Sequence, residues 1–143
     1  FKSVVPEISG HTEVESETSR KVAEHLARYN DFMQKLQIHH ATIEVIHIAQ
    51  LVNAYLNKTE PWKKWKEGNK ERVAVIIRHA LDWIYVINAI MYPFMPQAAR
   101  RLARQLGLEK PPCLENLKVW GNFKPGHKLG KREILFKKLE IAK

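Results

Sequence analysis

The chain has 143 residues, of which 45% are apolar, and it carries a formal net charge of +9. This length and composition fit one globular domain with a real core. The single cysteine, Cys113, excludes an internal disulfide and suits a reducing compartment. Residues 1–10 lack the charged and then apolar pattern of a secretory signal. Because the chain begins with Phe1 rather than Met, we expect it to be part of a longer protein.

The positive charge gathers in the last third of the chain. Residues 1–99 hold 12 Lys and Arg against 11 Asp and Glu, whereas residues 100–143 hold 12 against 4. This concentration favours an anionic partner over an ordinary solvated surface, although basic charge alone is a weak indication of RNA.

Residues 1–12 show no hydrophobic period, and we expect an extended N-terminal segment there. Glu13, Glu15 and Glu17 favour the start of a helix, because negative charge stabilises the positive end of the helix dipole. Apolar residues then recur at three- and four-residue steps, which predicts one face of an amphipathic helix. These residues are Val22, Leu26, Tyr29, Phe32, Met33 and Leu36.

A break near Gln37 precedes a second helix, which is apolar around much of its circumference and is therefore expected to lie centrally. Its apolar residues are Ile38, Ile43, Val45, Ile46, Leu51, Val52 and Tyr55. We expect it to end near Asn57 or Lys58, because the residue before Pro61 is disfavoured in the right-handed helical conformation.

Pro61 suits the first turn of a new helical segment, which puts Trp62 at a helix–turn–helix corner on the surface. Four lysines surround it, namely Lys58, Lys63, Lys64 and Lys66. An exposed ring among cations can stack on an unpaired nucleotide base while the cations meet the phosphates. The alternative is that Trp62 fills a gap between two helices, since most tryptophans are largely buried. Trp65 follows three residues later on the same face, and we expect one of the two to pack inward.

Gly68 and Asn69 interrupt the pattern before a third helix, expected from about Glu71 to Tyr92. Its predicted inner face comprises Val73, Ile76, Ile77, Leu81, Ile84, Ile87 and Met91. Charged and polar residues such as Arg78 and Asp82 interrupt it too often for a membrane span, so we interpret it as a buried helix and expect no membrane partner.

Pro93 ends this helix and Pro96 begins a fourth, with Gly107 as the residue just beyond its end. The residues expected to face inward are Ala99, Leu102, Ala103 and Leu106. The residues expected to face outward are Arg100, Arg101 and Arg104. These arginines could touch an RNA backbone, but we favour solvation.

The residues after the fourth helix are interpreted as a linker and a docked basic tail. Pro111 and Pro112 mark the linker. Leu114, Leu117 and Trp120 fit one short helical turn against the bundle. The only apolar anchor expected for the tail itself is Ile134, Leu135, Phe136 and Leu139. We therefore predict one all-α domain over residues 1–143, an up-down helix bundle over 13–107 with the linker and tail over 108–143.

Two motifs resemble chemical sites but lack residues that those sites require. His40, Glu44 and His47 share a helical face, but no Cys or further His lies at metal-ligand spacing, so solvated or hydrogen-bonded histidines are favoured over a metal. The stretch from Gly126 to Lys131 has three residues between its glycines, where a phosphate-binding loop needs four. We expect no catalytic, cofactor-binding or metal site.

Short motifs follow one another in a specific order: Asn53-x-Tyr55, Glu60-Pro61-Trp62, Pro93-Phe94-Met95-Pro96, Gln105-Leu106-Gly107, Gly126–Lys131 and Leu135–Glu140. Together, over roughly residues 29–141, they resemble the anticodon-binding domain of methionyl-tRNA synthetase. The resemblance implies the anticodon-binding helix bundle of class I aminoacyl-tRNA synthetases, with an irregular basic C-terminal tail.

The resemblance also implies a function: a cytoplasmic module that holds the anticodon loop of methionine tRNA beside the catalytic domain of the same chain. Trp62 matches the family's tryptophan that stacks on the first anticodon base, and Pro61 positions it. Asn53 and Asn57, one turn apart, could offer amide hydrogen bonds to an unstacked base, or could be solvated or capping groups. Lysines of the corner, among them Lys58 and Lys63, would meet the phosphates.

The parent enzyme would be a methionine–tRNA ligase, with ATP bound in its catalytic domain and no cofactor in this chain. The family's His-Ile-Gly-His and Lys-Met-Ser-Lys-Ser signatures are absent here, so we expect this chain to be inactive alone. The family's upstream Asn and Arg, which also read the base, would precede Phe1. Relatives tend to have Leu-Ala where this chain has Lys64-Trp65, so Trp65 supplies either packing or a second stacking surface.

Two alternatives stay open. The chain could be the helical domain of another class I synthetase, for valine, isoleucine, leucine or cysteine. It could also be a helical protein-interaction scaffold whose basic tail docks an acidic partner.

Overall fold

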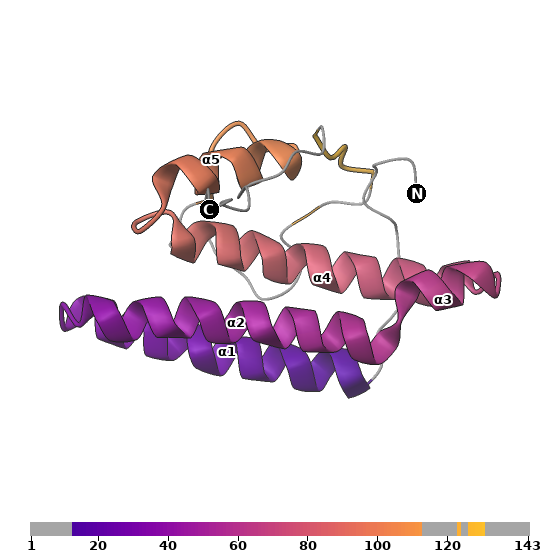
Figure 1. Cartoon of the computed structure of the whole chain (residues 1–143), viewed down its shortest axis with the longest axis horizontal. Helices are drawn as coiled ribbons and strands as arrows, with labels where there is room; N and C mark the ends of the chain where they lie inside the picture. Colours follow the sequence, from indigo (N-terminus) through magenta and orange to yellow (C-terminus); the bar gives the residue numbers. More distant parts are fainter. Residues whose placement is uncertain (1–12, 113–122, 124–125, 131–143) are drawn as a thin grey trace, which may run out of the picture.

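The computed structural model describes residues 13–112, 123 and 126–130. Within them the chain forms five helices: α1 Glu13–Gln34, α2 Ile38–Thr59, α3 Pro61–Lys66, α4 Lys70–Met91 and α5 Pro96–Gln105. No β-strand occurs in this part of the chain, which confirms the all-α prediction. Figure 1 shows α1 and α2 side by side, α4 along α2, and α5 on the other side of α4.

The helices begin and end at residues whose backbone or side-chain chemistry favours a helix boundary. Pro61 and Pro96 each occupy the first turn of a helix, where a missing N–H is tolerated. Asn69 caps α4, its side-chain oxygen accepting from the Arg72 backbone N–H at 3.3 Å. At the end of α5, Gly107 has φ 74° and Leu108 N–H donates to the Ala103 carbonyl at 2.8 Å, as in a Schellman ending.

α4 is the central helix of the bundle. It contacts α1, α2, α3 and α5, and it is long and apolar enough to cross a membrane by length and composition alone. Most of its apolar window is nevertheless buried inside the fold, as expected for a core helix. The prediction that α2 lies centrally is wrong in part: Ile38 and Ile46 are exposed, because α1 and α4 cover only two sides of that helix.

The core is built around Trp83 of α4, which is fully buried and meets the Tyr55 ring edge-on at 4.8 Å. The predicted inner face of α4 therefore needs a correction. Its members Ile77, Leu81, Ile84 and Ile87 are only half-buried, whereas Ala80, Trp83, Val86 and Ile90 are buried. α4 is covered by α2 on one side and α5 on the other, so its burial extends beyond the single stripe that a three-to-four-residue period indicates.

The turn between α1 and α2 corrects one further residue. Leu36 was predicted on the apolar face of α1, but it lies beyond the end of that helix in a left-handed conformation, with φ 58°, and is 81% exposed. The other members of the predicted face are buried or half-buried, as expected.

Part of the C-terminal region lies against the end of α5. Gly130 N–H donates to the Gln105 carbonyl at 2.9 Å, and His127 Nε2 lies 2.8 Å from the Leu106 carbonyl oxygen. A Cβ on Gly130 would lie 1.8 Å from the Arg104 carbonyl, so the two backbones meet as closely as glycine permits. The predicted helical turn at 114–120 and the apolar anchor at 134–139 lie outside the described residues.

Candidate nucleic-acid interface

The corner between α2 and α3 is made by a single residue, Glu60. α2 ends at Thr59, one residue beyond the predicted end, and Glu60 takes φ 46° and ψ 62°. Glu60 is thus outside the right-handed helical region, as predicted, but it is left-handed rather than extended. Its N–H donates to the Leu56 carbonyl, and its own carbonyl accepts from the N–H groups of Lys63 and Lys64. The same residue closes one helix and opens the next.

Side chains reinforce the corner. Lys64 Nζ donates to the Thr59 carbonyl at 2.6 Å, and the Thr59 hydroxyl donates to the Tyr55 carbonyl at 2.8 Å. Lys64 therefore caps the last turn of α2 and is half-buried, so it differs from the freely solvated cation that the sequence indicated. Lys63 forms a surface ion pair with Glu60 at 3.5 Å, which contributes at most about 1 kcal/mol.

Both tryptophans of α3 lie at the surface. Trp62 is 54% exposed and Trp65 is 45% exposed. The surface position predicted for Trp62 is confirmed, and the prediction that one of the two packs inward is wrong. The reason is that α3 has six residues at the end of the bundle and rests mainly on α4.

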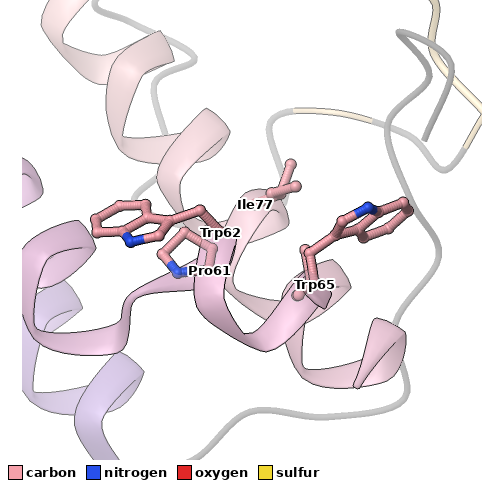
Figure 2. A pocket seen from close by; sticks show the side chains of 5 residues that line it. Pro61, Trp62, Trp65 and Ile77 are labelled. Atoms are coloured by element: carbon pink, nitrogen blue, oxygen red, sulfur yellow. The ribbon is translucent and has the colours of Figure 1, made fainter. Parts of the chain in front are cut away.

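A shallow apolar pocket of about 330 Å³ lies between the two rings (Figure 2). Its lining residues are Pro61, Trp62, Trp65, Val73 and Ile77. The rings of Trp62 and Trp65 extend to opposite sides of α3, with Ile77 between them (Figure 2). Lys70 Nζ lies 5.5 Å from the centre of the Trp65 ring, which is a cation–π contact.

The other predicted contact residues are exposed and lie near the same end of α2. Asn57 and Lys58 belong to its last turn, and Asn53 lies one turn earlier. Lys66, the last residue of α3, is also exposed. The corner thus carries a flat aromatic surface together with amide groups and ammonium groups that solvent can reach.

A buried polar network lies beneath the corner, and sequence reasoning missed it. Glu15 of α1 is fully buried; Tyr55 of α2 donates its hydroxyl to Glu15 Oε1 at 2.5 Å, and Arg72 of α4 pairs with the same oxygen at 2.6 Å. Burial raises the pKa of Tyr55 well above its usual range, and the hydrogen bond to Glu15 adds to the shift, so the phenol stays protonated and donating. Three helices are tied together where α2 ends and α4 begins.

α5, which carries three arginines, begins at the end of α4 opposite to this corner. α3 precedes α4 and α5 follows it, and 22 residues make α4 about 33 Å long. Arg100, Arg101 and Arg104 are exposed as predicted, and Arg100 lies over the Tyr92 ring at 5.7 Å. Their solvated placement is consistent with the interpretation favoured from the sequence.

His40, Glu44 and His47 all lie on α2, as predicted, but they divide between two contacts with α1. His40 stacks on the Phe32 ring at 5.2 Å, whereas Glu44 and His47 meet His25 of α1. No spacing pattern indicates a role for His25, because it lies 19 residues before Glu44 and on another helix.

Comparisons with known proteins agree with this architecture. A family model described as the anticodon binding domain of methionyl tRNA ligase matches residues 5–143. The methionine–tRNA ligase of Caldanaerobacter subterraneus is 30% identical over 146 residues, covering 100% of this chain and 23% of the relative. That of Thermotoga maritima is 29% identical over 140 residues, covering 98% and 22%. The chain therefore spans about a fifth of the length of these curated relatives.

A solved structure shows the same fold. The apo form of Mycobacterium tuberculosis methionyl-tRNA synthetase superposes with a TM-score of 0.83 over 98% of this chain and 29% of that chain. The sequence identity is 16%, so this likeness concerns the fold alone.

Proposed function

The chain belongs to the family of anticodon-binding domains of methionyl-tRNA ligases, and from this we infer that it binds the anticodon loop of a methionine tRNA. The observation that carries the proposal is the exposure of Trp62 on a corner fixed by hydrogen bonds on both sides. Its ring would stack on an unpaired anticodon base, an interaction that works with any base because every base has a π-face. Pro61, at the first position of α3, sets the direction from which Trp62 leaves the corner.

The polar residues of the corner divide into two groups in this proposal. Lys58, Lys63 and Lys66 are exposed and would meet the phosphates. Lys64 is not included, because its ammonium already serves the Thr59 carbonyl. The exposed amides of Asn53 and Asn57 would reach the edge of an unstacked base, because an amide offers both a donor and an acceptor.

The role proposed for Trp65 differs from that of Trp62. It forms the far wall of the shallow pocket, and Lys70 lies over its ring. A ring face that already carries a cation is a poorer stacking surface, so we assign Trp65 to support α3 on α4. The two roles, packing and a second stack, can be distinguished by comparing Trp65→Ala with Trp62→Ala. Each variant removes one tryptophan from the same short helix.

At the level of the whole enzyme, the chain would act as one module of a methionine–tRNA ligase that performs ATP-dependent aminoacylation in its catalytic domain. The names of the matched relatives and the fifth of their length that this chain spans support that placement. A cytoplasmic location is proposed on the same basis, since the Arabidopsis thaliana relative is named as the cytoplasmic ligase. We also propose that residues 1–143 form one domain and that the C-terminal tail docks on the helix bundle.

A binding titration tests the function. The chain is titrated into a labelled RNA hairpin with the methionine anticodon loop, and into a blunt duplex made from the same stem. We expect the hairpin to bind more tightly, because stacking needs unpaired bases. Three phosphate-contacting lysines predict a slope of about −2 in log affinity against log salt, at about −0.7 per phosphate on single strands. Equal affinity for hairpin and duplex, or no binding at low salt, would contradict the proposal and favour a protein-interaction scaffold.

A further inference from the structure

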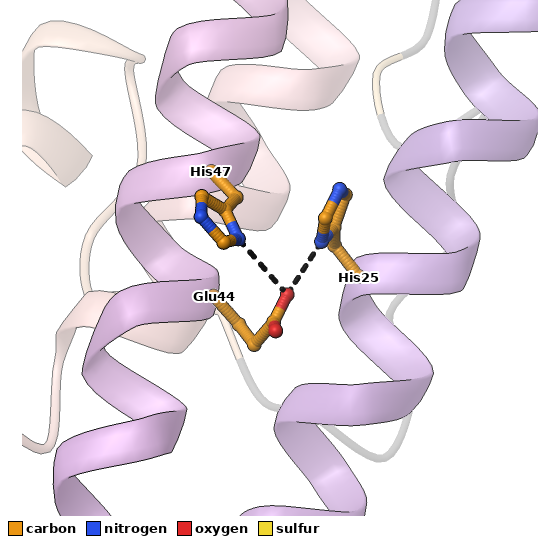
Figure 3. Close-up of side chains that lie close together, drawn as sticks. All are labelled: His25, Glu44 and His47. Carbon is orange, nitrogen blue, oxygen red and sulfur yellow. Dashed lines mark hydrogen bonds and ion pairs between the residues drawn. The ribbon is translucent and has the colours of Figure 1, made fainter.

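Three metal-ligating side chains meet at the interface between α1 and α2 (Figure 3). His25 Nδ1 lies 2.5 Å from Glu44 Oε2, and His47 Nδ1 lies 3.6 Å from the same oxygen. The three potential ligand atoms all lie within 4.8 Å of one another. Glu44 and His47 are three residues apart on α2, so one helical face presents both, and His25 approaches from the facing helix.

The two imidazole rings are oriented as metal ligands would be, with one nitrogen of each facing the Glu44 carboxylate. Figure 3 shows the Nδ1 atoms of His25 and His47 both turned toward one carboxylate oxygen of Glu44, with the other ring nitrogens pointing away. His47 Nδ1 is buried and has no hydrogen-bond partner among the described residues, since 3.6 Å to the carboxylate is too long for a hydrogen bond. A buried polar atom without a partner is costly, and a cation between these groups would satisfy it.

We propose that His25, Glu44 and His47 bind a divalent transition-metal ion of the zinc class. Two imidazole nitrogens and one carboxylate oxygen are the protein ligands of many zinc sites, with a fourth position taken by water. The set disfavours Mg²⁺ and Ca²⁺, which prefer oxygen ligands throughout. One side of the cluster lies near solvent, because the His47 side chain is 43% exposed whereas those of His25 and Glu44 are 19% and 8% exposed.

Two of the three ligand spacings must change to form a tetrahedral site: the His25 and His47 nitrogens, up to 4.8 Å apart, must close by up to about 1.5 Å, and the His25–Glu44 spacing must open. Bonds of about 2.0–2.1 Å in a tetrahedral site separate neighbouring ligand atoms by about 3.3 Å. The 3.6 Å between His47 and Glu44 is already near this value. The 2.5 Å between His25 and Glu44 must open by about 0.8 Å, which a small rotation of the His25 side chain can supply. The backbones of α1 and α2 stay where they are.

The site would act as a clip between two helices and would be independent of the RNA-binding corner. His47 and Thr59 are twelve residues apart on α2, which is about 18 Å along the helix axis. Metal binding should therefore stabilise the bundle without changing RNA affinity. The proposal does not depend on the proposed function, and either can fail while the other holds.

The test uses the untagged chain after removal of metals with a chelator. Zn²⁺ is titrated by calorimetry, and Co²⁺ is titrated by visible absorption, because tetrahedral Co²⁺ gives intense bands that octahedral surface binding does not. We expect one ion per chain, a Zn²⁺-dependent rise in melting temperature and tetrahedral Co²⁺ bands. His25→Ala and His47→Ala should each weaken Zn²⁺ binding at least 10- to 100-fold, the range known for loss of mere supporting groups around a metal.

His39→Ala is the matched control, because His39 is exposed on the same helix and lies outside the cluster. Its Zn²⁺ affinity and Co²⁺ spectrum should equal those of the parent chain. A cooperative melting transition of each metal-free variant establishes that it is folded. Because His47 is partly exposed, His47→Ala is the substitution that should disturb the core least. Parent-like Zn²⁺ affinity in folded His47→Ala, or loss of binding in His39→Ala instead, would overturn the proposal.

Discussion

Replacing Trp62 by alanine separates recognition from packing. One base–aromatic stack is worth about 1–3 kcal/mol, so Trp62→Ala should weaken hairpin binding roughly 5- to 150-fold. The cost in stability can be bounded from the structure. Trp62 is 54% exposed, so about half of its surface is covered, on the order of 100 Å². At about 25 cal/mol per Å² this gives an upper bound of about 2.5 kcal/mol, against about 3–5 kcal/mol for a buried tryptophan such as Trp83.

The assay measures both quantities on the same samples: hairpin affinity by fluorescence anisotropy and unfolding free energy by urea. Trp62→Phe should keep part of the affinity, because a smaller π-face remains. Trp65→Ala is the matched control, since its side chain is on the same helix and 45% exposed, so it should lose similar stability and little affinity. A Trp62→Ala chain that loses about 3 kcal/mol or more in stability, with normal RNA affinity per folded molecule, would refute the reasoning.

Four further outcomes are expected. Lys64→Met should lower the unfolding free energy by about 1.5–3 kcal/mol in urea, because a charged donor to the Thr59 carbonyl is lost, and should leave the salt slope of hairpin binding unchanged. Lys63→Met should do the reverse, reducing that slope by about 0.7 with little effect on stability. Burial raises the pKa of Tyr29 to about 12, so its protonated form is favoured by folding. Stability should hold below about pH 10 and fall as pH rises toward 12, and Tyr29→Phe should make that fall in urea stability shallower, with the part due to Tyr55 remaining. The chain alone should show no methionine-dependent pyrophosphate exchange above a heat-killed control.

Much of the fold could be predicted because local rules decide it. Pro61, Asn69, Pro96 and Gly107 each stand where their backbone chemistry ends or begins a helix, and the helices follow within a residue or two. The surface position of Trp62 was predictable for the same reason. Leu36 was misplaced because an apolar residue at helical spacing does not reveal that the helix has already ended.

What could not be predicted depends on which helices meet. The Glu15–Tyr55 bond joins residues 40 apart, and His25 reaches Glu44 from another helix, so no spacing in the sequence indicates either contact. The exposure of Trp65 depends on α3 resting mainly on α4. Lysines 63 and 64 are neighbours of identical chemistry, and only the position of the Thr59 carbonyl makes one of them a cap.

The left-handed conformation of Glu60 bears on the entropy of binding. A non-glycine residue held at φ 46° costs about 1–3 kcal/mol, which the surrounding hydrogen bonds must offset when the chain folds. In return, α3 has one orientation before RNA arrives, and the stacking ring needs little further ordering. Glu60→Gly would relieve the strain yet allow many directions for α3, so the hairpin should then bind with a larger entropic penalty and a less favourable free energy. Affinity at this corner is thus set partly by a backbone angle in a residue that need not touch the RNA.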